Sequence, residues 1–230
     1  MIFWVHEDFQ PQPRQERTSL WNEYKRLLVA PDMGALYSST FLFSLGRSVI
    51  LPVAALFVMQ LMGPESPVAT TTGILMGASA LFGSLSTVWM GKLGDRIGHT
   101  RVLFIGALAA VLLYAPQAFV TAAWQLVILQ ALTGFASGAM VPAIGALMNL
   151  RTPNGSQGAT YGLDSSINAA ARMVAPMLGA GVALWFGFRG VFALAALIYV
   201  FSAAVALHLW RRETAMHLDA HSLPLAGAGD

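Results

Sequence analysis

Four polar side chains interrupt segments that are otherwise apolar, and their types and spacing are those of a polar binding site or ion path. Asp164, Asn168 and Arg172 recur every fourth residue, so on a helix they form one stripe. Arg47 lies near the middle of an earlier apolar segment. If these segments cross a bilayer, each charge costs a few kcal/mol there unless it meets a partner, water or a ligand. The stripe could therefore bind a polar substrate, and Asp164 in a water-filled path could carry protons.

Each of these residues also has a purely structural interpretation. Arg47 and Arg172 could hold helices together, and Asp164 lies close enough to the end of its segment to reach water. Gln130, in the apolar segment before Asp164, is a fifth candidate for the same pathway. These alternatives stay open at the level of sequence.

The composition indicates an integral membrane protein. The 230 residues are 56% hydrophobic and only 10% charged, with a mean hydropathy of +0.62, whereas soluble domains are about a quarter charged. The net charge of +2 creates no broad field for nucleic acid. Because the sequence contains no cysteine, disulfides and thiolate metal sites are excluded.

Six apolar segments of near-spanning length predict an all-α, polytopic fold, a bundle of six transmembrane helices. Each is close to the roughly 20 residues that a membrane helix needs. They run from Met33–Met62, Val68–Met90, Val102–Thr121, Trp124–Asn149 and Ala159–Phe186 to Val191–Trp210.

Basic residues gather in alternate connections, which predicts a cytoplasmic location for both termini. The basic side holds Arg14, Arg17, Lys25, Arg26, Lys92, Arg96, Arg101, Arg151, Arg211 and Arg212. The opposite connections hold only Glu65, a neutral turn near Ala122, and Arg189.

Three regions follow from this pattern. Residues 1–32 are predicted to be a cytoplasmic linker, beginning with the remnant of a preceding helix and including an amphipathic surface helix over Ser19–Ala30. Residues 33–210 form the bundle, and 211–230 a cytoplasmic, disordered tail. His217 and His221 could share a metal on a helix, but a disordered tail without a metal site is the prediction.

A short basic stretch between the second and third segments has the pattern of a gating loop. Its glycines allow a sharp turn, and its cations favour the cytoplasmic side. It resembles the loop of the major facilitator superfamily, Gly-x-Leu-Ala-Asp-Arg-x-Gly-Arg-Lys-x-x-Leu. The residues that carry the resemblance or its charge are Gly91, Leu93, Asp95, Arg96, Gly98, Arg101 and Leu103, while Gly94, His99 and Thr100 depart from the pattern.

Later stretches extend the resemblance over most of the chain. Ala175-Pro176-x-x-Gly179-x-Gly181 is similar to the family's eleventh helix, and residues 187–192 to the turn into its last helix. In the family's N-terminal half the position of Gln130 is commonly an arginine linked to proton coupling, so Gln130 suits the C-terminal half and weakens a coupling role. The order of these stretches resembles the C-terminal six helices of a bacterial drug:proton antiporter of the multidrug-efflux type.

The resemblance implies a secondary transporter in the bacterial inner membrane, not an enzyme, with no cofactor. Its expected partners are protons, an amphipathic small molecule, the lipid bilayer and a complementary six-helix bundle, either a missing N-terminal half or a second copy. Two alternatives remain: a truncated or split fragment that does not transport, and a facilitator for a sugar or organic anion. The two intramembrane arginines keep the anion alternative open.

Overall fold

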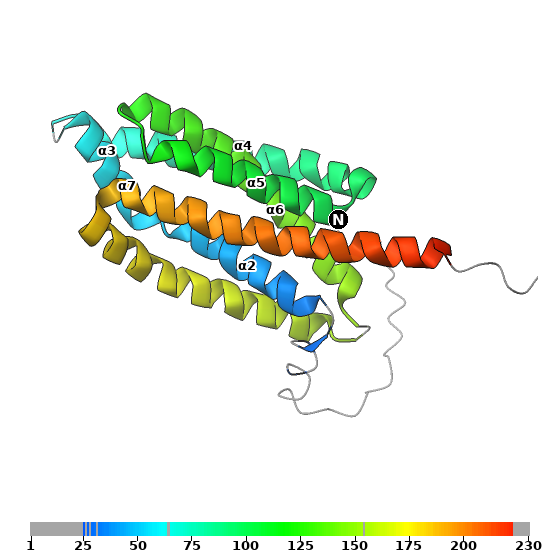
Figure 1. Ribbon diagram of the computed structural model, residues 1–230. Coiled ribbons are helices and arrows are strands. Elements are labelled where there is room, and N and C mark those ends of the chain that lie inside the picture. The colour runs from blue at the N-terminus through cyan, green and yellow to red at the C-terminus, as the bar shows by residue number, and fades with distance from the viewer. Residues whose placement is uncertain are drawn as a thin grey trace, which may run out of the picture.

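The computed structural model describes Lys25, Leu27 and residues 29–30, 32–63, 65–153 and 155–222. From residue 216 to residue 222 it describes the backbone alone. All regular structure in these residues is helical, in α2 (Met33–Ser48), α3 (Leu51–Met62), α4 (Val68–Ile97), α5 (His99–Gln117), α6 (Ala123–Arg151) and α7 (Gln157–Ser222). The helices run roughly parallel or antiparallel to one another (Figure 1). The all-α class is therefore confirmed.

The chain folds back within α7, so the described helices make six passes. Gly187 has φ 70° and ψ 177°, and it separates two helical parts of α7. The apolar span counted over Gln157–Ala215 has 59 residues, or about 88 Å of helix, against a hydrocarbon core of about 30 Å. In Figure 1 the second part, from residue 188 onward, runs back beside the first. We call these parts α7a and α7b.

Helix ends differ from the predicted spans at the basic loop. α4 continues through Ile97 and α5 begins at His99, so Gly98 alone, with φ 98°, makes the turn. The stretch expected to be a loop is therefore mostly the last turns of one helix and the first turn of the next. The first span is also divided: α2 ends at Ser48 and α3 begins at Leu51, just ahead of Pro52.

Close backbone contacts set the packing of α6. A Cβ added to Gly134 would meet the backbone of Ser79, and one added to Gly138 would meet that of Gly83. This Gly-x-x-x-Gly pair therefore lets α6 and α4 touch backbone to backbone. The similar spacing of Gly73 and Gly77 faces open space, so spacing alone does not identify a contact.

Two buried tyrosines, one from α5 and one from α7b, lie where α2 packs against α7b. The rings of Tyr114 and Tyr199 stack with centroids 5.2 Å apart, and a Cβ on Gly46 would lie 2.8 Å from the Tyr199 ring. Only glycine therefore lets α2 approach α7b this closely. The close approach places the residue after Gly46, Arg47, on the exposed side of the helix.

Helix α7 extends into the region predicted to be a disordered tail. α7 stays helical through Ser222, in a stretch from Arg211 that contains neither Gly nor Pro to stop it. The backbone of His217 and His221 belongs to this helix, but their side chains lie outside the described surroundings. The predicted linker over 1–32 and its surface helix lie outside the described residues, apart from a few positions near residue 30.

Candidate functional site

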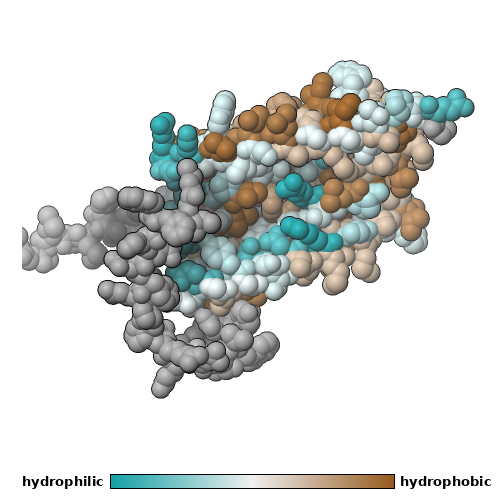
Figure 2. Space-filling view, turned by 180° about the vertical axis from the view of Figure 1, so that it is seen from behind, coloured by the Kyte–Doolittle hydropathy of each residue, from teal (hydrophilic) through white to brown (hydrophobic). Residues whose placement is uncertain are grey.

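A polar cavity of about 810 Å³ opens between α2, α6 and α7a. Seen from behind the view of Figure 1, this side of the bundle shows hydrophilic atoms among hydrophobic ones (Figure 2). The lining residues are Thr40, Phe43, Ser44, Arg47, Ser48, Leu51, Val141, Ile144, Gly145, Met148, Tyr161, Asp164, Ser165, Asn168, Arg172 and Pro176. The structure thus brings together four of the five predicted pathway residues, Arg47, Asp164, Asn168 and Arg172.

The α7a stripe is held in place by hydrogen bonds. The Asn168 side-chain amide donates to the Asp164 backbone carbonyl, 3.1 Å away, and to the Asp164 carboxylate, 3.2 Å away. Ser44 of α2 donates its hydroxyl to Oδ1 of Asn168. Asn168 therefore connects α7a to α2, and both helices line the cavity.

The sequence analysis did not identify the serine and threonine residues that line the α2 wall of the cavity. Thr40, Ser44 and Ser48 recur every fourth residue of α2 and all line the cavity. This is the same spacing that identified Asp164, Asn168 and Arg172. The four-residue spacing was visible in the sequence. Hydroxyl residues are common in membrane helices and so indicate little by themselves, whereas charged residues are costly there and indicate a function.

The two cavity arginines are exposed and carry the excess charge of the site. Within the described residues, neither Arg47 nor Arg172 makes an ion pair or a hydrogen bond. Asp164 lies eight residues from Arg172 on the same helix, about 12 Å along its axis. With all three ionised, the cavity holds one net positive charge.

Gln130 does not join this group. It lies eleven residues before Val141, the first α6 residue of the lining, on the part of α6 that packs closely against α4. α4 itself, the second predicted span, contributes no lining residue among the described positions. Close glycine contact between α4 and α6 leaves no space there.

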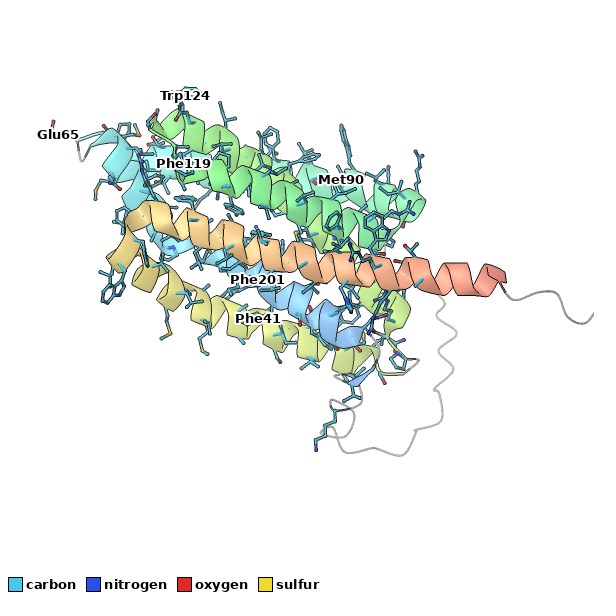
Figure 3. All side chains as sticks on the ribbon, viewed as in Figure 1. Phe41, Glu65, Met90, Phe119, Trp124 and Phe201 are labelled. Atoms are coloured by element: carbon cyan, nitrogen blue, oxygen red, sulfur yellow. The ribbon has the colours of Figure 1, made fainter. Side chains whose placement is uncertain are left out.

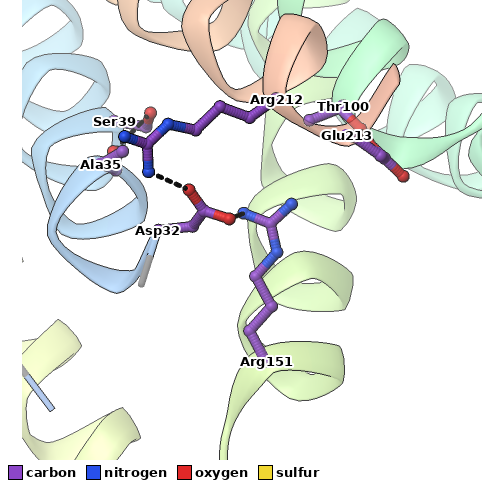
Figure 4. A network of polar contacts seen from close by, with 7 residues as sticks. All are labelled: Asp32, Ala35, Ser39, Thr100, Arg151, Arg212 and Glu213. Atoms are coloured by element: carbon purple, nitrogen blue, oxygen red, sulfur yellow. Dashed lines mark hydrogen bonds and ion pairs between the residues drawn. The ribbon is translucent and has the colours of Figure 1, made fainter. Parts of the chain in front are cut away.

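A second group of arginines lies at the end of the bundle where α2 begins (Figure 4). Asp32, which precedes α2, accepts from Arg212 of α7b at 3.3 Å and pairs with Arg151 of α6 at 3.5 Å. The Asp32 side chain is only 10% exposed. On the adjacent side of α7b, Glu213 accepts a hydrogen bond from Thr100 of α5. We call these five residues the terminal network.

The predicted gating residues lie at the turn between α4 and α5. Asp95 is 74% exposed, and its carboxylate lies 3.3 Å from the imidazole of His99. A Cβ on Gly94 would collide with that imidazole, so Gly94 and His99, two departures from the family pattern, fit one another. Arg101 lies over the ring of Trp210. Asp95 therefore has a neighbour in this chain.

Comparison with known proteins decides the family. The profile of the Major Facilitator Superfamily matches residues 36–224. The chain belongs to the Major Facilitator Superfamily. It is 30% identical over 212 residues to the "Multidrug resistance protein MdtG" of Salmonella dublin, Salmonella arizonae and Salmonella typhimurium. Each match covers 92% of this chain and 52% of the relative.

Family membership gives the cavity its context. The protein is a multi-pass membrane protein of a facilitator family, and the family points to transport. The chain spans about half the length of the curated relatives it matches. Facilitators bind substrate between two six-helix bundles, and the six passes of the described residues match one such bundle in number.

Proposed function

We propose that this chain supplies half of the translocation pathway of a proton-coupled exporter of amphipathic small molecules. The observation that carries the proposal is the open cavity in which Arg47, Asp164, Asn168 and Arg172 meet between α2, α6 and α7a. Apolar lining from Phe43 and Met148 suits an amphipathic molecule, and the polar stripe suits its head group. Asp164 is the candidate proton carrier.

The partner in this proposal is a complementary six-helix bundle, and the chain is the C-terminal half. The half-length match to the multidrug relatives supports this. α4 supports it as well, since it is the least buried of the candidate spans and exposes Leu81, Leu85, Val88 and Trp89. In the assembled transporter, Asp95 and Arg96 are proposed to contact the partner bundle and so bias it between its inward- and outward-open states.

The decisive experiment compares the chain alone with the chain joined to a complementary half. We propose expressing each in a bacterium that lacks its own exporters, using the remaining half of the Salmonella typhimurium relative, and measuring loss of a preloaded amphipathic dye. The joined protein should expel dye only while a proton gradient is maintained, and the chain alone should not expel it. Gradient-driven expulsion by the chain alone would show that a second copy can complete the pathway. No expulsion by a correctly inserted joined protein would contradict the exporter proposal.

Insertion in the inner membrane with both termini cytoplasmic is part of the same proposal. A reporter active only outside the cytoplasm should be silent when fused after Arg212 and active when placed at Glu65. The even number of passes supports a common side for the two ends of the described chain. Activity at Arg212 and silence at Glu65 would reverse the topology.

A facilitator for organic anions is the second candidate. Its support is the pair of exposed guanidiniums, Arg47 and Arg172, for which the described part of the chain offers no ion-pair partner. Guanidinium binds carboxylate and phosphate in a bidentate manner. In the same joined protein, an anionic dye would then be expelled in preference to a cationic dye of equal size. The opposite preference would rule this candidate out.

A further inference from the structure

A second, separate groove lies on the other side of α2 from the polar cavity. It has a volume of about 900 Å³ and is lined by Phe41 and Ser38 of α2, Ile167 of α7a, and Phe201, Ala204 and His208 of α7b, among others. Phe41 and Phe201 lie beside one another on the face turned to the viewer in Figure 3. The cavity and the groove share no lining residue, so this groove is not part of the proposed substrate pathway.

The groove is apolar along most of its length. Two lining residues carry a hydroxyl: that of Ser38 donates to the carbonyl of Gly34 at 2.8 Å, and that of Tyr37 is buried behind the groove surface, without a hydrogen-bond partner among the described residues. Phe201 is 57% exposed, and Ala204 is exposed as well. Such a surface within a membrane span suits a hydrocarbon chain.

One end of the groove is basic. Arg211 follows Ala204 by seven residues and Arg212 follows His208 by four, so both continue the helix face that forms the groove wall. Arg212 is engaged by Asp32, whereas Arg211 is exposed and has no hydrogen-bond or ion-pair acceptor among the residues that the structure describes. The imidazole of His208 adds a further polar group at this end.

The length of the groove matches one leaflet of a bilayer. Ten residues of helix separate Phe201 from Arg211, a rise of about 15 Å, and the hydrocarbon core of a bilayer is about 30 Å thick. An acyl chain lying against Phe41 and Phe201 would therefore place its head group beside His208 and Arg211. A zwitterionic head would place a positive charge there too, whereas an anionic head matches the basic end.

We propose that this groove binds an anionic phospholipid from the leaflet at the end of the bundle where α2 begins. The acyl chain occupies the apolar groove, and the phosphate is held by Arg211 with His208. Neither transport nor a second bundle is required for this binding, so it stands or falls independently of the exporter proposal.

Native mass spectrometry of the whole purified chain tests the proposal directly. The chain in detergent is titrated with phosphatidylglycerol or with phosphatidylcholine of identical acyl chains. The detergent is then removed in the spectrometer, and the fraction of the chain that keeps a bound lipid is measured. Phosphatidylglycerol should bind more tightly, and Arg211→Gln should weaken it about fivefold toward the phosphatidylcholine value. Lys92→Gln, which removes an exposed cation elsewhere on the same end of the bundle, should leave both lipids unchanged.

Filling the groove separates chain binding from head-group binding. Ala204→Trp fills the groove without changing the net charge and should reduce the binding of both lipids. If Ala204→Trp lowers the melting temperature, Ser38→Phe, which fills the groove from α2, replaces it as the test. Equal binding of the two lipids, no effect of Arg211→Gln, or a dimer that Ala204→Trp abolishes would each overturn the proposal. The last result would assign the groove to a second copy of the chain.

Discussion

The polar cavity and the terminal network each contain two arginines, but they use them differently. Arg151 and Arg212 share the carboxylate of Asp32, which is 10% exposed and joins α2, α6 and α7b. Arg47 and Arg172 point into an open cavity, and the described residues give them no acceptor. Removing the partner of a partly buried cation is destabilising, whereas an exposed cation without a partner is available to a ligand. The same side chain thus shares a carboxylate in one place and, in the other, lines a cavity without an acceptor among the described residues.

The comparison predicts its largest effect in the cavity. Arg47→Ala combined with Arg172→Ala should weaken the binding of a fluorescent anionic amphiphile by at least about 100-fold, since each hydrogen bond to a charged group contributes about 1.5–3 kcal/mol. Binding is measured by fluorescence titration of the purified chain. The melting temperature in detergent should hardly change, because both side chains are exposed.

Lys92→Ala is the matched control for that experiment. It removes an exposed cation from α4, outside the cavity, and should leave binding unchanged. If the double arginine variant unfolds more readily but still binds the amphiphile, the two arginines hold helices together, and the contrast with the terminal network disappears.

The next largest effect belongs to Asp32. Asp32→Asn removes the shared charge but keeps a residue that tolerates the φ of 66° found there. Two cations then lose their anionic partner, one of them the 18%-exposed Arg151. We expect a loss of about 1–3 kcal/mol in the free energy of unfolding and unchanged binding of the amphiphile. The measurement is thermal unfolding in detergent.

Glu65→Gln provides the control for Asp32→Asn. Glu65 is exposed and lies at the opposite end of the bundle from the start of α2 (Figure 3), so its replacement should change stability by less than about 0.5 kcal/mol. Equal destabilisation by the two variants would mean that net charge, and not the terminal network, sets the stability.

A smaller effect on stability and affinity is expected from loss of the hydrogen bond between Ser44 and Asn168 in the cavity wall. Ser44→Ala removes the hydroxyl that donates to Asn168, and should cost about 0.5–1.5 kcal/mol of stability and only a few-fold in affinity. Affinity and unfolding are measured on the same samples. A loss of affinity as large as that of the double arginine variant would make Asn168, and not the guanidiniums, the main binding group.

The smallest effect should come from Asp95→Asn. The Asp95 side chain is 74% exposed and has only His99 beside it, and an exposed pair contributes about 0–1 kcal/mol. Thermal unfolding of the chain should therefore be nearly unchanged, while dye export by the joined protein should change. A large loss of stability would show that Asp95 holds this bundle together and would end its proposed role between bundles.

Much of the fold followed from sequence because a bilayer leaves few alternatives. Runs of about 20 apolar residues had to be helices, and a turn at Gly187 had to separate the last two of these helices. The exact ends were less predictable: the stretch after Met90 is polar, but polar residues at the membrane surface are free to stay helical, so α4 runs on to Ile97. The continuation of α7 through Ser222 has the same cause.

The sequence pointed to the cavity residues that carry a charge, and it missed the features that depend on helix packing. Arg47 and Arg172 stood out because charges are costly in a membrane, and both line the cavity. Gln130 lies on a helix face that continues toward the cavity, yet contact at Gly134 and Gly138 closes α6 against α4 there. No local pattern revealed Asp32, because its partners Arg151 and Arg212 are far away in the sequence.

The central claim is that the cavity is open to water and positively charged, and the absence of cysteine from the chain allows a direct measurement. Ser165→Cys places one thiol in the cavity, and Ser39→Cys places one at a buried position near the terminal network. Their reaction rates with an anionic and a cationic thiosulfonate reagent are compared with those of a small thiol in solution. We predict that the thiol at residue 165 reacts readily and favours the anionic reagent, that Arg47→Ala with Arg172→Ala abolishes this preference, and that the thiol at residue 39 hardly reacts. A thiol at residue 165 that favours the cationic reagent, or that reacts as slowly as the one at residue 39, would contradict the account.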